Sequence, residues 1–184
     1  MGERRVSRRR LLATVGASTG IGTAGCLEGE VGADDPQLGD PEPFERIELA
    51  SEDGDVSVDP PVVHLVDGGT VEWTVDAGVH DVTAYHPDTH GSRQRIPADA
   101  EPWASGRLEG GDGFDRVFDG EGVYDYVSTP NDALGAAGSV VVGWPDPNGE
   151  PGLEPPGDEC PPITCDVLER YNERVRDVLE EVHG

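Results

Sequence analysis

The sequence predicts an all-β sandwich followed by a short C-terminal helix. From Phe44 to Gly143, short segments of alternating apolar and polar residues are separated by Gly, Asp and Pro, which is typical of strands joined by tight turns. Val71, Trp73 and Val75 alternate with polar residues, so one face of this segment is apolar and the other is wet. No stretch within this range favours a long helix. About 100 residues are enough to bury a core of their own.

The expected strands can be placed from this alternation. Asp67–Thr70 is expected to form a tight turn between two strands, and Gly120–Gly122 another. The strands themselves are expected at Phe44–Leu49, Val56–Val58, Val62–Val66, Val71–Val75, Val82–Tyr85, Phe114–Phe118, Val123–Val127 and Ser139–Val142.

The charge of the chain limits its partners and its source. Among 184 residues there are 38 acidic and 13 basic ones, and the formal net charge is −25. All the basic residues are Arg. Such a charge repels nucleic acid and anionic lipid headgroups, so we expect neither as a ligand. It also repels itself, unless concentrated salt shortens the screening length to about 3 Å. We therefore expect a halophilic, archaeal source.

The N-terminus predicts export and anchoring. Arg8–Arg10 precede a short apolar stretch, and residues 1–25 resemble a twin-arginine lipoprotein signal peptide. Cys26 follows small residues at its end and is the expected lipidation site. Residues 26–43 are acidic and rich in Gly and Pro, which is typical of a flexible tether. We expect the protein on the outer face of the cell membrane, held there by the lipid on Cys26.

Several motifs within residues 44–143 resemble one family, the halocyanins, which are plastocyanin-like blue copper proteins of haloarchaea. The resemblance implies a cupredoxin-type Greek-key β-sandwich and a family role in carrying single electrons outside the membrane. The motifs that carry it are Val71–Thr74, His80–Pro87, Ile96–Pro97, Glu101–Trp103, Phe118–Tyr126 and Ser128–Gly138.

The copper ligands that the family implies are largely replaced. A blue copper centre needs two imidazoles, a Cys thiolate and a weak axial thioether. His80 matches the first imidazole. Ser128 stands at the thiolate position, Asn131 at the second imidazole and Ala136 at the thioether. We therefore expect no type 1 copper site and no cofactor, with copper bound only if the family function persists.

Other side chains offer alternatives around His80. The simplest expectation is that His80 hydrogen-bonds to Asn131 or Ser128 as an ordinary polar group. An improvised Zn(II) or Cu(II) site is the alternative. Its candidate ligands lie close together in the sequence, while His64 and His183 lie elsewhere: His80, Asp81, His86, Asp88 and His90.

Cys160 and Cys165 are the remaining cysteines if Cys26 is lipidated. Outside the cytoplasm, two nearby cysteines most often form a structural disulfide. A reduced pair that captures Cu(I) is the alternative. They lie at the end of residues 144–162, a segment rich in Pro, Gly and acidic residues that we expect to be a linker.

Residues 163–184 predict an amphipathic helix. Asp166 followed by Glu169 resembles an N-terminal capping box. The sequence leaves open whether the helix docks on the sandwich or mediates association with a partner or a second copy. Its expected apolar stripe consists of Leu168, Tyr171, Val175, Val178 and Val182.

Three functions remain open from the sequence. The first is a copper-free binding or structural module at the cell surface, assembling with a membrane respiratory-chain or surface protein. The second is electron transfer through an atypical copper site, as the resemblance implies. The third is metal buffering by His80 and the Cys pair. Because no hydrolytic triad, acid–base carboxylate pair or phosphate loop is evident, we do not expect an enzyme.

Overall fold

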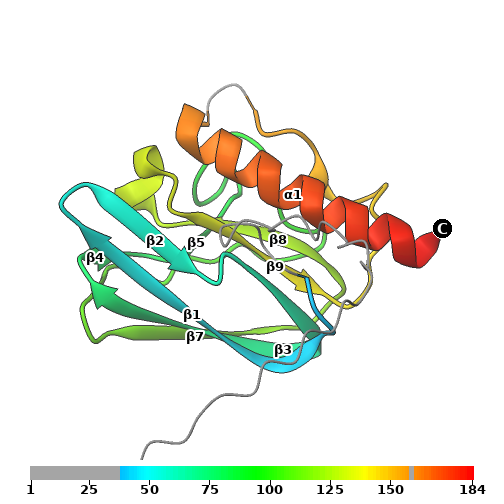
Figure 1. The fold of residues 1–184 in the computed structure, drawn as a ribbon, viewed down its shortest axis with the longest axis horizontal. Coiled ribbons are helices and arrows are strands. Elements are labelled where there is room, and N and C mark those ends of the chain that lie inside the picture. Colours follow the sequence, from blue (N-terminus) through cyan, green and yellow to red (C-terminus); the bar gives the residue numbers. More distant parts are fainter. Residues whose placement is uncertain (1–37, 158–159) are drawn as a thin grey trace, which may run out of the picture. The chain divides into compact units, whose positions relative to one another are not determined.

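The computed structural model describes residues 38–157 and 160–184, which form a β-sandwich with one long helix (Figure 1). The predicted all-β fold with a C-terminal helix is confirmed. The expected signal peptide, Cys26 and most of the expected tether lie outside the described residues. The elements are β1 (Glu42–Glu52), β2 (Asp55–Asp59), β3 (Val62–Ala77), β4 (Val79–His80), β5 (Thr83–Ala84), β6 (Leu108–Glu109), β7 (Gly113–Phe118), β8 (Gly122–Val127), the 3-10 helix η1 (Thr129–Leu134), β9 (Ala137–Val142), the 3-10 helix η2 (Pro151–Leu153) and α1 (Pro162–His183).

The sheet topology is mixed. Strands β2, β1, β3, β9, β8 and β5 are hydrogen-bonded in this order, and β7 also pairs with β3. The β1–β3 and β3–β9 pairs are parallel, and the other pairs are antiparallel. The short strands β4 and β6, which the sequence did not predict, pair only with each other. Strand β3 is therefore the element that joins the two sides of the sandwich.

The prediction of a tight turn at Asp67–Thr70 is wrong. Residues 62–77 form one continuous strand whose partners change along its length. Val62–Leu65 pair with β9, whereas residues from Gly69 onward pair with β7. Gly68 has a φ of 78°, and a Cβ on Gly69 would lie 2.8 Å from the Val66 carbonyl oxygen. The two glycines therefore let the strand bend from one sheet to the other, a role that local sequence cannot distinguish from a hairpin turn.

The main core lies between the two sides of the sandwich. The expected alternation along β3 is present, since Trp73 and its neighbours at steps of two are buried. The Trp73 ring contacts Tyr126 edge-on at 5.3 Å and Phe118 at 6.2 Å between centroids. Trp103 packs edge-on against Phe118 at 5.5 Å. These aromatic contacts join β3, β7 and β8 across the core.

Strands β8 and β9 are buried along their whole length. One set of their side chains faces the main core, and the other set, including Val123 and Val141, lies in a second apolar cluster with Val175 and Leu179 of α1. Figure 1 shows α1 running across this side of the sheet. The helix docks on the sandwich, which resolves the alternative that the sequence left open.

The helix begins earlier than the capping-box prediction placed it, and that prediction is wrong. Helix α1 starts at Pro162 with Pro161 at the N-cap, so Asp166 lies inside the helix and is exposed. Proline is suited to the first helical position because the missing N–H would have no partner there. Buried Thr164 replaces the expected cap as an anchor, since its hydroxyl donates to the Asp132 carbonyl of η1.

The expected apolar stripe of α1 is correct in its first half and wrong in its second. Leu168, Tyr171 and Val175 are buried. Val178 is half-buried and Val182 is 53% exposed, whereas Leu179 is fully buried. The four buried positions are three or four residues apart and follow one face of the helix, which packs on the sheet. Leu179 lies on this face, whereas the neighbouring Val178 lies at its edge.

The segment expected to be a linker packs against the domain. Leu153 of η2 is buried, and its carbonyl accepts a hydrogen bond of 2.7 Å from Arg176 Nη2 of α1. His183 Nε2 lies 2.9 Å from the Trp144 carbonyl oxygen. Residues 144–157 therefore run as a packed strap beside the helix. Among the described residues, no helix is long and apolar enough to cross a membrane.

Candidate functional site: the His80 cluster

Two segments far apart in the sequence bring together His80, Ser128, Asn131 and Ala136, which we call the His80 cluster. His80 lies in β4, and the other three residues lie on the connection from β8 through η1 to β9. A Cβ on Gly78 would lie 2.0 Å from Ser51 Oγ, so glycine is required for β4 to approach β1. All four residues of the cluster are buried, and His80 is completely so.

Hydrogen bonds connect His80, Ser128 and Asn131 within the cluster. His80 Nδ1 lies 3.1 Å from Ser128 Oγ, as the sequence suggested. Asn131 Nδ2 donates to the Val79 carbonyl at 2.7 Å and lies 3.4 Å from both Ser128 Oγ and His80 Nδ1. Ser128 Oγ also accepts from the Asp81 amide at 3.3 Å. Because donors already face Ser128 Oγ, its own proton is directed at His80 Nδ1, which assigns Nδ1 as the acceptor.

The loop around the cluster is held by its own backbone and by Asp81. The Ser128 amide donates to the Ala136 carbonyl at 2.8 Å, and the Asn131 amide donates to the Ser128 carbonyl at 2.9 Å. Asp81 accepts from the Thr129 amide at 2.7 Å and from the Thr129 hydroxyl. Ser, Thr and Asn side chains are suited to such local bonds. These contacts hold the loop in its shape.

The environment of His80 favours a neutral ring. Burial lowers the pKa of His80, and the Ala77 carbonyl and the Asp81 carboxylate oppose this shift without reversing it. With Nδ1 as an acceptor, the remaining proton is on Nε2, which is buried and has no hydrogen-bond partner of ordinary geometry among the described residues. A neutral imidazole held by a hydroxyl is a structural polar group in its present surroundings.

The donor set does not fit a type 1 copper ion. Copper needs a thiolate and a second imidazole, whereas Ser128 offers a hard, protonated hydroxyl and Asn131 a neutral amide. The Asn131 amide nitrogen is directed at the Val79 carbonyl and Ser128 Oγ, and Ala136 supplies only a methyl group. The hydrogen bond from Ser128 moreover occupies the lone pair of His80 Nδ1. The residues present thus replace a coordination shell with a hydrogen-bond network.

The other histidines each have separate partners. His90 Nε2 lies 2.8 Å from Asp132 Oδ2, and His86 Nδ1 accepts from the Asp88 amide at 3.1 Å. The ring nitrogens of His64 lie 2.6 Å from the carbonyl oxygens of Gly39 and Gly143. In the part of the chain that the structure describes, no group of three or more His, Cys, Asp or Glu side chains is placed to share a metal ion.

Cys160 and Cys165 are joined by a disulfide at the start of α1, with their Cα atoms 5.7 Å apart. The bond closes the loop that leads from the strap into the helix. Cys160 is buried beside Leu168 and Val127 in a small apolar cluster. In this state, the sulfur atoms are not available as thiolate ligands.

One buried network was missed by sequence reasoning. Arg95 Nε donates to Asp125 Oδ2 at 2.8 Å, and both side chains are almost completely buried. Ser139 Oγ donates to Asp125 Oδ1 at 2.5 Å, and Asn172 Nδ2 of α1 donates to Oδ2 at 3.2 Å. Burial raises the pKa of Asp125, and Arg95 opposes this. The available signal was Asn172, a polar residue inside the apolar stripe of the helix.

Comparisons with known proteins agree with this architecture. No family model matches the chain. Halocyanin of Natronomonas pharaonis is 35% identical over 86 residues, which are 46% of this chain and 47% of that protein. The chain thus spans about half the length of the curated relative it matches.

Solved structures resemble the fold over a larger part of the chain. A pseudoazurin from Sinorhizobium has a TM-score of 0.55 at 23% identity, covering 72% of this chain and 95% of the other. Pseudoazurin from Hyphomicrobium denitrificans has a TM-score of 0.56 at 16% identity, covering 71% and 97%. At such identities, the likeness shows the fold alone. Taken with the halocyanin match and the β-sandwich described above, it shows that the chain has a cupredoxin-like fold and is similar to halocyanin over 86 residues.

Proposed function

We propose that this chain is an exported, lipid-anchored cupredoxin-fold protein that acts as a binding or structural module at the cell surface, without type 1 copper. One observation carries the proposal. The positions that would supply the copper ligands are Ser128, Asn131 and Ala136, and the polar ones among them bond to each other and to His80. A site organised in this way has no thiolate with which to exchange electrons through copper.

The contacts that hold the loop around the His80 cluster support a structural role for this loop. The Asp81–Thr129 contacts and the Ser128–Ala136 backbone bond hold the loop. Buried polar atoms without partners are costly. In the described cluster, Ser128 and Asn131 bond to each other and Ser128 bonds to His80, which leaves His80 Nε2 as the only buried polar side-chain atom of the cluster without a partner. This network supports a fold kept for its surface.

Electron transfer through copper is the competing function, since the matched relative is named a halocyanin. A direct test compares the wild-type chain with the variant Ser128→Cys/Asn131→His/Ala136→Met after addition of Cu(II), in concentrated salt. We expect the variant to gain the intense visible band of thiolate-to-copper charge transfer and the wild type to remain colourless. Because Ala136 is fully buried and Met could crowd the core, the double variant Ser128→Cys/Asn131→His serves as a second test.

The control adds His80→Gln to the coloured variant, which should remove the band if His80 is one of its ligands. Stoichiometric copper in wild-type protein taken from its native host would overturn the copper-free proposal. So would a charge-transfer band in the wild-type chain.

The anchoring part of the proposal has its own test. Cys26→Ser should move the protein from the membrane fraction to the medium, measured by immunoblot of separated fractions. An unchanged membrane fraction would refute anchoring through Cys26. The binding part fails if no membrane respiratory-chain or surface protein co-purifies with the wild-type lipoprotein after cross-linking.

A further inference from the structure

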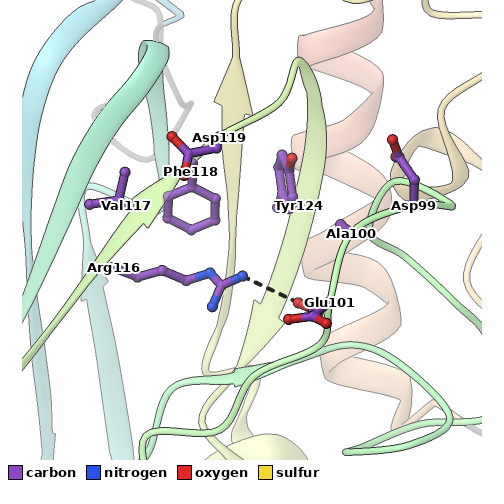
Figure 2. Close-up of a pocket in the computed structure, with 8 residues that line it drawn as sticks. All are labelled: Asp99, Ala100, Glu101, Arg116, Val117, Phe118, Asp119 and Tyr124. Carbon is purple, nitrogen blue, oxygen red and sulfur yellow. Dashed lines mark hydrogen bonds between the residues drawn. The ribbon is translucent and has the colours of Figure 1, made fainter.

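A pocket outside the His80 cluster is built around Arg116. It has a volume of about 240 Å³ and lies between β7, the start of β8 and the segment at residues 99–101. Figure 2 shows the Arg116 side chain extending below the Phe118 ring toward the main chain of Glu101, with Tyr124 farther along the pocket. No residue of the His80 cluster lines it.

Arg116 is held in place by groups that do not neutralise it. Its guanidinium lies 4.5 Å from the Trp103 ring centroid and 5.5 Å from that of Phe118. Nη2 donates to the Glu101 carbonyl at 3.2 Å. Aromatic faces and one carbonyl fix the orientation of a guanidinium but leave most of its donors free.

Arg116 differs from three other described arginines in its partners. Arg46, Arg95 and Arg107 each form an ion pair with a carboxylate. Arg116 has no carboxylate oxygen within 4.0 Å among the described residues, and its buried Nε has no hydrogen-bond partner there. Some other arginines also have no carboxylate partner among the described residues: Arg93, Arg170, Arg174 and Arg176. Of the described arginines, however, only Arg116 has a buried side-chain nitrogen without a hydrogen-bond partner, and this requires an explanation.

Charges at the rim complete the pocket. The side chains of Asp99, Glu101 and Asp119 are exposed around its mouth. The fields of Glu101 and Asp119 act on Arg116, yet burial outweighs them and lowers the pKa of Arg116. The guanidinium remains charged at any physiological pH. Burial and the neighbouring acids raise the pKa of Tyr124 to about 12, so its hydroxyl is neutral and donates to the Gly120 carbonyl at 2.8 Å.

These features select a ligand that carries both charges. A simple anion would be attracted by the guanidinium but repelled by the three rim carboxylates. A simple cation would be attracted by the carboxylates but repelled by the guanidinium. The pocket is smaller than most ligand sites, so its occupant must be small. We propose that the Arg116 pocket binds a small zwitterion of the α-amino acid type, whose carboxylate accepts from the guanidinium and whose ammonium group lies beside the rim acids.

The test uses the full-length protein and three probes. Glycine carries both charged groups of the proposed ligand, whereas acetate carries only the carboxylate and methylammonium only the ammonium group. Glycine, acetate and methylammonium are titrated separately while the Arg116 Nε–H signal is followed by ¹H–¹⁵N NMR. We expect glycine to shift this signal saturably, with acetate and methylammonium each binding roughly tenfold or more weakly, because each lacks one charge-assisted contact.

Matched variants locate the binding. Arg116→Gln should abolish saturable glycine binding, measured by calorimetry, whereas Arg107→Gln, which removes an exposed arginine outside the pocket, should leave it unchanged. Because Arg116 also packs on Trp103, Asp119→Asn is a milder second variant that should weaken glycine but not acetate. Absence of saturable glycine binding, acetate binding as tight as glycine, or equal affinity in Arg116→Gln would overturn the proposal.

Discussion

Ser128 links three segments through one hydroxyl group. Its oxygen accepts from the Asp81 amide, lies within 3.4 Å of Asn131 Nδ2 and faces His80 Nδ1. A thiol could not play this part equally well, because sulfur is a weak hydrogen-bond acceptor. Ser128, at the position where the resemblance to halocyanins implies a thiolate, is therefore matched by its neighbours, and the cluster is internally consistent at the scale of single residues.

Asp81 is the side chain whose loss should weaken the loop most directly. It accepts two hydrogen bonds from Thr129, and Asp81→Asn leaves one of these donors without an acceptor. We expect the free energy of unfolding to fall by about 1–3 kcal/mol. Denaturant unfolding measures it. Asp88→Asn, the same change at an exposed position, is the control and should have little effect; equal losses in the two variants would contradict this assignment.

The lowered pKa of His80 predicts a pH dependence of stability. In the unfolded chain, the ring takes up a proton near its ordinary pKa of 6.5, but in the folded chain it resists protonation. The unfolded state thus binds more protons, and the His80 contribution to stability is present above about pH 6.5 and is lost as the pH falls below it.

Unfolding of the wild type and His80→Gln at several pH values isolates this contribution from that of the other histidines. We expect the difference in unfolding free energy between the two proteins to shrink as the pH falls below about 6.5. A difference that stays constant across that range would show that His80 does not resist protonation.

At the scale of elements, α1 covers a sheet face that would otherwise be apolar and exposed. Strands β8 and β9 have no outward polar face because the helix and the main core bury their two sides. The helix and these strands therefore depend on each other. The packed strap connects α1 to the sandwich over a short path, which limits how far it can separate, and the disulfide closes the turn between the strap and the helix.

The revised stripe of α1 gives a specific prediction. Leu179→Ala removes a fully buried side chain from the interface with the sheet and should lower the free energy of unfolding by about 2–5 kcal/mol. Val182→Ala, at an exposed position that the sequence pattern had placed in the stripe, should change it by less than about 0.5 kcal/mol. Thermal and denaturant unfolding measure both. A larger loss of unfolding free energy from Val182→Ala would show that Val182 belongs to the buried stripe, as the sequence pattern predicts.

At the scale of the whole molecule, the Arg95–Asp125 pair joins parts that are distant in the sequence. Arg95 reaches Asp125 of β8 and the carbonyls of Gly152 and Glu154 in the strap, and Asn172 of α1 bonds the same carboxylate. The sandwich, strap and helix thus share one buried polar network, and the C-terminal region folds as part of the domain.

Breaking this network on one side should be severe. Arg95→Met leaves the Asp125 carboxylate buried without its cation, and we expect a loss of about 3–5 kcal/mol in unfolding free energy. Arg107→Met removes an exposed ion pair of the same kind and should cost about 1 kcal/mol or less. The double variant Arg95→Met/Asp125→Leu should recover part of the stability. If Arg95→Met cost no more than Arg107→Met, the buried pair would not hold the molecule together.

The amino-acid sequence by itself determined the β-sandwich, the terminal helix and the replaced ligand positions. The sandwich and the helix depend on local alternation and helical spacing, which are readable along the chain. The ligand positions rest on the resemblance to halocyanins. The sequence also suggested that His80 would bond to Ser128 or Asn131, because the resemblance places these two residues at the other ligand positions.

Only the tertiary structure decided what depends on contacts between distant segments. Local periodicity could not tell a bend in β3 from a turn, because the difference depends on which strands pair with each end of it. Nor could it tell whether Leu179 or Val178 is buried, because that depends on which face of the helix packs on the sheet. The Arg95–Asp125 network and the Arg116 pocket join residues from separate elements. Their chemistry arises from burial and mutual orientation, which the chain acquires when it folds.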